Sequence, residues 1–332
     1  VRHDPEASVV ELSDEIPGEV PPGAAFEVRS PEEAPVLAAR LLTGTPPSRS
    51  LPVESMRLGT TLGTNALLER RGARIALFIT RGFADLLRIG DQQRPDLFAL
   101  DVSKPEPLYA TVVEVPERIA ADGSVLDPLD AASLDDRIES LVGDGIEVAA
   151  IALLHSYRNP VPENRLEDRL ARAGFKHVSC SSSLAPFIKI VPRAETSVVD
   201  AYLAPKLRDY LGRVGTALGD GRLHVMTSAG GLVAPASFRP KDSLLSGPAG
   251  GVVGAALSGR RAGFEKIIAF DMGGTSTDVS RVDGDFEYLF EHRVGDARLV
   301  ASALAIETVA AGGGSICRFD GQRLRVGPES AG

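Results

Sequence analysis

Short apolar runs alternate with amphipathic segments along most of the chain. Nearly continuous apolar runs predict buried strands at 74–80, 147–155 and 266–272, because a strand covered on both faces has no polar side. Periodicity near 3.6, ended by glycine, predicts helices at 133–145, 162–174 and 248–263. A longer helix is expected at 196–218, where Pro205 should kink or split it. Strands alternating with helices predict an α/β fold, a sheet with helices packed on its faces.

The first part of the chain has a different character. Residues 1–56 are rich in proline and irregular, with one helix predicted at 31–42. A chain of 332 residues is long enough for two domains. We place them at 1–135 and 136–332.

Composition narrows the class of protein. Hydrophobic residues are 43% and charged residues 24% of the chain, as in globular proteins. The net charge of -9 argues against a nucleic-acid partner, because neutralising phosphates needs basic surface. No apolar run reaches the roughly 18 residues of a membrane span, so no membrane partner is expected. The two cysteines, Cys180 and Cys317, form no disulfide framework and favour a reducing cytoplasm. We expect Cys317 to be a small buried residue.

One loop carries most of the candidate chemistry. In KIIAFDMGGTSTDVSRVDGDF, residues 266–286, a strand ends in Asp271 and two glycines follow. A Walker loop would need a lysine and a following helix. Here the next residues alternate, Asp283-Gly284 predicts a hairpin turn, and 285–294 predicts a further strand. The loop therefore joins two antiparallel strands. A hairpin tip of the form Asp-x-Gly-Gly-Thr is typical of the phosphate loop of actin-like ATPases.

The residue types suit phosphate and Mg²⁺. Backbone N–H groups of Gly273, Gly274 and Thr275 could hold phosphate oxygens, with the hydroxyls of Thr275 and Thr277. Asp271 is predicted to hold Mg²⁺ through water, and Asp278 to order a water or the metal shell; both are candidate catalytic residues. The alternative is a tight hairpin whose Asp and Thr side chains only cap the turn.

At this point the sequence resembles the hydantoinase/oxoprolinase family. FDMGGTSTDVS resembles the second phosphate motif of that family, and LLSGPAGGVVGAA (244–256) its glycine-rich helix start. Residues 57–100 match almost continuously. Further matching segments are LLHSYRNP (153–160), RAETSVVDAYLAP (193–205), TSAGGLV (227–233) and ETVAAGGGSICRFDG (307–321). The resemblance runs from about residue 50 to the C-terminus.

The resemblance implies a fold and a reaction. The fold would be that of the actin-like ATPases, sugar kinases and Hsp70, with the family's N-terminal region in 1–135 and its ATPase domain in 136–332. ATP and Mg²⁺ would phosphorylate the carbonyl oxygen of a cyclic amide, which a hydantoinase B-type domain or subunit then hydrolyses. For 5-oxoproline the product is L-glutamate. N-methylhydantoin, a ketone carboxylated as its phosphoenol, and a non-catalytic nucleotide-binding scaffold remain possible. A homo- or hetero-oligomer in the cytoplasm is expected.

The chain departs from the family pattern in one respect. Members open with another Asp-x-Gly-Gly-Thr loop, and actin-like ATPases bind nucleotide between two such loops. Only the second is present here. The chain is therefore expected to be an internal fragment that does not turn over ATP alone.

Four further groups of residues are candidates through the resemblance. Thr61 and Asn65 would line the substrate site, or else they cap a helix. Arg94 and Asp96 would grip a substrate carboxylate, or else they form an exposed pair of little energetic value. Gly312, Gly313 and Gly314 would contact the nucleotide, or else they form a bend. Ser246 and Gly247 would form an anion site where a helix begins, or else the serine is a cap.

Overall fold

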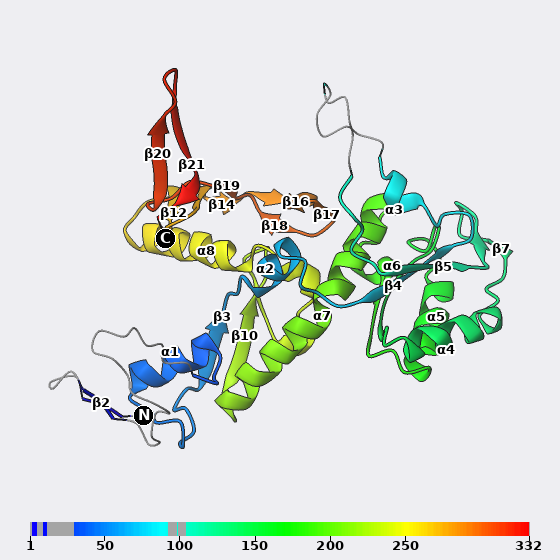
Figure 1. Cartoon of the computed structure of the whole chain (residues 1–332), viewed down its shortest axis with the longest axis horizontal. Coiled ribbons are helices and arrows are strands. Elements are labelled where there is room, and N and C mark those ends of the chain that lie inside the picture. Colours follow the sequence, from blue (N-terminus) through cyan, green and yellow to red (C-terminus); the bar gives the residue numbers. More distant parts are fainter. Residues whose placement is uncertain (1, 5–8, 12–29, 92–97, 99–103, 332) are drawn as a thin grey trace.

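The computed structural model describes residues 2–4, 9–11, 30–91, 98 and 104–331. Arg94 and Asp96 lie outside the described residues. In Figure 1 the parallel sheet and its helices lie on the right, and the hairpin of β20 (Ser315–Phe319) and β21 (Leu324–Ser330) lies at the upper left. Helix α7 (Ile190–Leu218) runs from the sheet toward the N-terminal part of the chain at the lower left. The predicted α/β class is confirmed.

Four parallel strands form the first sheet, in the order β5-β4-β8-β9. The strands are β5 (Thr111–Val115), β4 (Ile75–Thr80), β8 (Val148–Ala152) and β9 (His177–Cys180). All residues of β4 and β8 are buried, as their continuous apolar sequence predicts. Strands β5 and β4 precede residue 135, and β8 and β9 follow it. The domain boundary placed at residue 135 stays a prediction.

Helices cover both faces of this sheet. One face packs on α4 (Asp135–Gly143) and α5 (Val161–Arg172) through Ile138, Leu141 and Leu166. The other face packs on α7 (Ile190–Leu218). Helix α7 continues through Pro205 and is not split there. Shorter elements complete this part of the chain: α2 (Leu62–Leu68), α3 (Leu86–Ile89), β6 (Arg118–Ile119), β7 (Val125–Asp127) and α6 (Ser181–Leu184).

A smaller sheet lies along the far half of α7. Strand β10 (Arg222–Met226) pairs in parallel with β3 (Ser55–Leu58) and antiparallel with β11 (Leu232–Val233). The predicted N-terminal helix is confirmed as α1 (Ala34–Thr43), which packs here. Two short strands, β1 (Arg2–Asp4) and β2 (Val9–Glu11), form a separate pair.

The last part of the chain combines one helix with a set of short strand pairs. Helix α8 (Ser246–Arg261) packs on β12 (Lys266–Met272) and β13 (Thr277–Asp283) through Ala256, Ala269 and Val282. Strand β13 also pairs with β19 (Glu307–Val309). The final hairpin is β20 (Ser315–Phe319) with β21 (Leu324–Ser330). Cys317 in β20 is exposed, so its predicted burial is wrong: this hairpin has no layer packed over it in the described chain.

The single strand predicted at 285–294 is also wrong. It is divided into β14 (Asp285–Phe286), β15 (Tyr288–Leu289) and β16 (His292–Val294). Each piece pairs with a different partner, namely β13, β18 (Ala303–Leu304) and β17 (Ala297–Leu299). One straight strand could not reach three partners. Among the described residues, no helix has the length and apolar character that crossing a membrane requires.

Candidate functional site

The β12–β13 hairpin presents the predicted phosphate loop at its tip. Met272 pairs with Thr277, and the Gly273 N–H donates to the Ser276 carbonyl oxygen at 2.9 Å. The loop therefore joins two antiparallel strands and does not lead into a helix. This confirms the local structure that the sequence predicted.

A second glycine segment lies directly on this loop. Gly313 donates its N–H to the Gly273 carbonyl oxygen at 2.9 Å, and Gly314 donates to Gly274 at 2.8 Å. A Cβ on Gly312 would lie only 2.4 Å from the Gly273 oxygen, so this close approach requires glycine. The two glycine segments, predicted as separate nucleotide contacts, form one double-layered loop.

The hydrogen bonds within the double layer decide which donors remain for a ligand. The N–H groups of Gly312, Gly313 and Gly314 all bond to protein acceptors. Thr277 is buried, and its hydroxyl donates to Ala311 at 2.6 Å. In the part of the chain that the structure describes, the N–H groups of Gly274 and Thr275 find no protein acceptor, and both residues are exposed. These two groups are the donors best placed for phosphate.

Two carboxylates lie beside the loop, on the face of the hairpin that packs on α8. Asp271 and Asp278 pair directly across the two strands. A Cβ on Gly251 of α8 would lie 3.9 Å from Asp271 Oδ2, so a glycine surface of the helix faces this carboxylate. Asp278 Oδ1 accepts a hydrogen bond from Thr308 Oγ1 at 2.6 Å. The sequence analysis did not single out Thr308, whose only signal is its place in the family-matching segment 307–321.

The carboxylates of Asp271 and Asp278 are ligands that suit Mg²⁺. The ion commonly takes one or two carboxylates and completes its shell with water and substrate phosphate oxygens. Two opposed aspartates beside exposed backbone donors provide the protein share of such a shell. Among the described residues, no cluster of three or more His, Cys, Asp or Glu side chains could hold a metal by itself.

Helix α8 also contacts the segment that contains Thr61. Ser246 is fully buried at the start of α8, where its hydroxyl donates to the Thr60 carbonyl oxygen at 2.8 Å. A Cβ on Gly247 would lie 3.3 Å from the Thr61 methyl group. Thr61 occupies the N-cap position of α2 but makes no side-chain capping bond, and Asn65 lies within α2. One helix thus contacts both Thr61 and Asp271.

Comparison with known proteins identifies a family. A family model of the hydantoinase/oxoprolinase N-terminal region matches residues 26–174, and a model of hydantoinase/oxoprolinase matches residues 193–332. The chain is 44% identical over 304 residues to 5-oxoprolinase 1 of Arabidopsis thaliana. That match covers 84% of this chain and 24% of the relative, so the chain spans about a quarter of its length.

Two solved structures are similar over most of the chain. An ATP-dependent caprolactamase from Pseudomonas jessenii has a TM-score of 0.75 and 28% identity, covering 90% of this chain and 46% of its own. A nucleotide-free acetone carboxylase has a TM-score of 0.69 and 28% identity, covering 84% and 42%. The predicted actin-like ATPase type of fold is confirmed by this likeness.

Proposed function

Because this chain belongs to the hydantoinase/oxoprolinase family, we propose that it binds the phosphates of ATP in an enzyme that hydrolyses a cyclic amide. The observation that carries the proposal is the double-layered glycine loop beside the paired carboxylates of Asp271 and Asp278. A loop that only turned a hairpin would need no second glycine layer on its carbonyl groups.

The proposed chemistry uses positioning and charge. A lactam is a poor electrophile, and transfer of the terminal phosphoryl group of ATP to its carbonyl oxygen creates a leaving group. Phosphoryl transfer depends mainly on alignment and neutralisation of charge, so no protein nucleophile is required. The N–H groups of Gly274 and Thr275 would hold phosphate oxygens, and Asp271 with Asp278 would hold Mg²⁺ directly or through water.

The remaining candidates have supporting roles in this proposal. Gly312, Gly313 and Gly314 fix the phosphate loop in place through their own backbone, and the bound nucleotide would lie against the same layer. Gly247, Thr61 and Asn65 would line the site near the start of α8. Ser246 was predicted as an anion contact, but it is fully buried and its hydroxyl is bonded to the Thr60 backbone, so it would hold this segment in place. Arg94 and Asp96 are proposed to contact the substrate carboxylate.

We propose 5-oxoproline as the substrate, with L-glutamate as product, because the 5-oxoprolinase relative has high identity over most of this chain. The likeness to acetone carboxylase keeps a ketone as the second candidate. N-methylhydantoin is a third candidate substrate, and a non-catalytic nucleotide-binding scaffold would need no substrate at all. A hydantoinase B-type domain or subunit would complete hydrolysis, within a cytoplasmic oligomer.

ATP consumption tests the proposal directly. The complete protein containing these residues would be assayed with 5-oxoproline, N-methylhydantoin and acetophenone in turn. We expect stimulation by 5-oxoproline and formation of glutamate. Stimulation by one of the other two compounds would assign that compound as the substrate. No stimulation by any of the three would contradict the enzyme proposal and favour a non-catalytic nucleotide-binding scaffold.

A further inference from the structure

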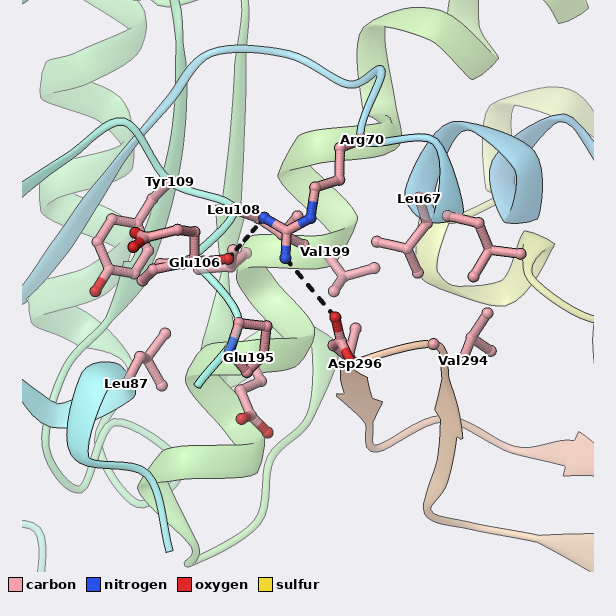
Figure 2. Close-up of a pocket in the computed structure, with 16 residues that line it drawn as sticks. Leu67, Arg70, Leu87, Glu106, Leu108, Tyr109, Glu195, Val199, Val294 and Asp296 are labelled. Carbon is pink, nitrogen blue, oxygen red and sulfur yellow. Dashed lines mark hydrogen bonds and ion pairs between the residues drawn. The ribbon is translucent and has the colours of Figure 1, made fainter. Parts of the chain in front are cut away.

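A cavity of about 160 Å³ lies at a different place from the phosphate loop. Helix α2, the 105–109 segment, helix α7 and the β16–β17 hairpin all contribute to it (Figure 2). None of its lining residues belongs to the double-layered glycine loop. Its apolar walls include Leu67, Leu87, Leu108, Val198, Val199 and Val294.

The size and walls of the cavity suit a small ring. Val198, Val199 and Val294 are at most 8% exposed, so these walls are part of the packed core. An apolar cavity of roughly 150 Å³ can accommodate benzene. A five- or six-membered ring would therefore fill this space.

Arg70 brings a cation to the cavity. Its guanidinium extends between Glu106 and Asp296 (Figure 2), donating to the Glu106 carbonyl oxygen at 2.8 Å and lying 3.8 Å from Asp296 Oδ2. A guanidinium has five N–H donors, so others remain for a ligand oxygen. Arg70 has a φ of 54°, just after the end of α2, where glycine is usual. An arginine that keeps this backbone conformation carries its side chain toward the cavity.

Of the three acidic residues that line the cavity, Glu195 and Asp296 lie beside arginines. Glu195 accepts a hydrogen bond from Arg298 Nε at 3.1 Å, and burial raises the pKa of Glu195. Asp296 lies beside Arg70. A wider space of about 500 Å³ shares Glu195, Glu106 and Asp296 with the cavity.

We propose that this cavity binds a small molecule built on a five- or six-membered ring, with an acceptor oxygen hydrogen-bonded to Arg70. The assignment rests on the proposed function for its ligand class, because the proposed substrate is a cyclic amide. Its location depends on the cavity and not on the phosphate loop. Neutral cyclic amides and ring carboxylates both have such a ring and an oxygen that can accept a hydrogen bond from Arg70. Helix α2 is about 10 Å long, with the cavity at its C-terminal end and Thr61 at its N-cap, beside the start of α8.

Binding of two probes tests the proposal: 2-pyrrolidinone, a neutral ring amide, and 5-oxoproline, which adds a carboxylate. Affinities of the complete protein containing these residues would be measured by calorimetry and saturation-transfer NMR. We expect Arg70→Met to weaken binding about tenfold, since a hydrogen bond to a charged donor is lost. Arg71→Met is the matched control, because Arg71 is 73% exposed and does not line the cavity. Binding of both probes would indicate a site for the amide, and binding of 5-oxoproline alone a site for the carboxylate.

A second variant tests the location independently. Leu108→Phe would fill the cavity from the 105–109 segment and should reduce binding of either probe at least tenfold, while Leu126→Phe on exposed β7 should not. Thermal unfolding would confirm that each variant is folded. Absence of binding by both probes, or equal binding by wild type, Arg70→Met and Leu108→Phe, would overturn the proposal. Asp271→Asn should leave ring binding unchanged, so this test and that of the ATP site can fail separately.

Discussion

Gly313 donates its backbone N–H to the carbonyl oxygen of Gly273, although one residue precedes β20 and the other follows β12. The bond places one glycine segment on top of the other. The conformation of the phosphate loop therefore depends on a segment that lies in a different strand pair. A substitution that moves the backbone of residues 312–314 should therefore change the conformation of residues 273 and 274.

Gly312→Ala should disturb the phosphate loop without changing any residue in it. The new Cβ would lie 2.4 Å from the Gly273 oxygen, and both contacting groups are backbone, so one layer must move. We expect a loss of about 1–3 kcal/mol in the free energy of unfolding and at least tenfold weaker ATP binding. Denaturant unfolding and calorimetry would measure both.

Gly313→Ala is the matched control for this prediction. Its Cβ would lie 3.8 Å from the same oxygen, an ordinary contact. Similar losses for both variants would contradict the stacking argument.

Asp271→Asn should lower ATP hydrolysis by the complete protein at least a hundredfold, because it removes a charge proposed to hold Mg²⁺. Asp283→Asn at the other end of the same hairpin removes only an exposed pair with Lys266 and should leave activity within about twofold. Steady-state kinetics with varied Mg²⁺ would check this. Full activity of Asp271→Asn would refute the metal-binding role.

Arg70→Gly should stabilise the fold while weakening ring binding. Glycine adopts the left-handed conformation of residue 70 without the cost of about 1–2 kcal/mol that a side chain has there. This gain outweighs the loss of the partly exposed contacts of Arg70 with Glu106 and Asp296, so the free energy of unfolding should rise by about 0.5 kcal/mol. Arg71→Gly, without positive φ, should instead lower it by about 0.5–1 kcal/mol through the entropy of the unfolded chain. Urea unfolding of both variants would show opposite signs, and equal signs would contradict the conformational argument.

Glu117 should make the stability of the first sheet depend on pH. It is 2% exposed, and burial raises its pKa despite a hydrogen bond from Thr80 and the charge of Arg118. The folded state thus keeps a proton that the unfolded state loses as pH rises above 4.5, and stability falls over that range until the folded pKa is passed.

Glu117→Gln should remove this part of the pH dependence, because glutamine stays neutral. Urea unfolding from pH 4 to 9 would show a flatter profile than the wild type. The exposed Glu139→Gln should reproduce the wild-type profile. An unchanged slope in Glu117→Gln would show that Glu117 ionises at its usual pH.

The two cysteines should differ in reactivity. Burial raises the pKa of the Cys180 thiol far above its usual range, whereas Cys317 is exposed. A thiol reagent at pH 8 should label Cys317 within minutes and Cys180 only after unfolding. Mass spectrometry of the labelled peptides would show this order, and early labelling of Cys180 would indicate opening of the sheet.

Much of this protein follows from its sequence alone. Continuous apolar runs predicted β4 and β8, because only doubly covered strands lack a polar side. The order strand, Asp-x-Gly-Gly-Thr, strand predicts the β12–β13 hairpin, which the structure confirms. The phosphate site at its tip stays a prediction. These features depend on residues that are close together in the sequence, so their pattern can be read from the sequence directly.

Other features were decided only by the tertiary structure. The sequence marked Gly273 and Gly312 as separate candidates, but their contact arises from the pairing of β19 with β13. The sequence analysis did not single out Arg70, and the cavity beside it is lined by five segments that are distant along the chain: α2, α3, residues 105–109, α7 and the β16–β17 hairpin. Such sites form where separate elements meet, and the pattern within any one element does not specify which other element will pack against it.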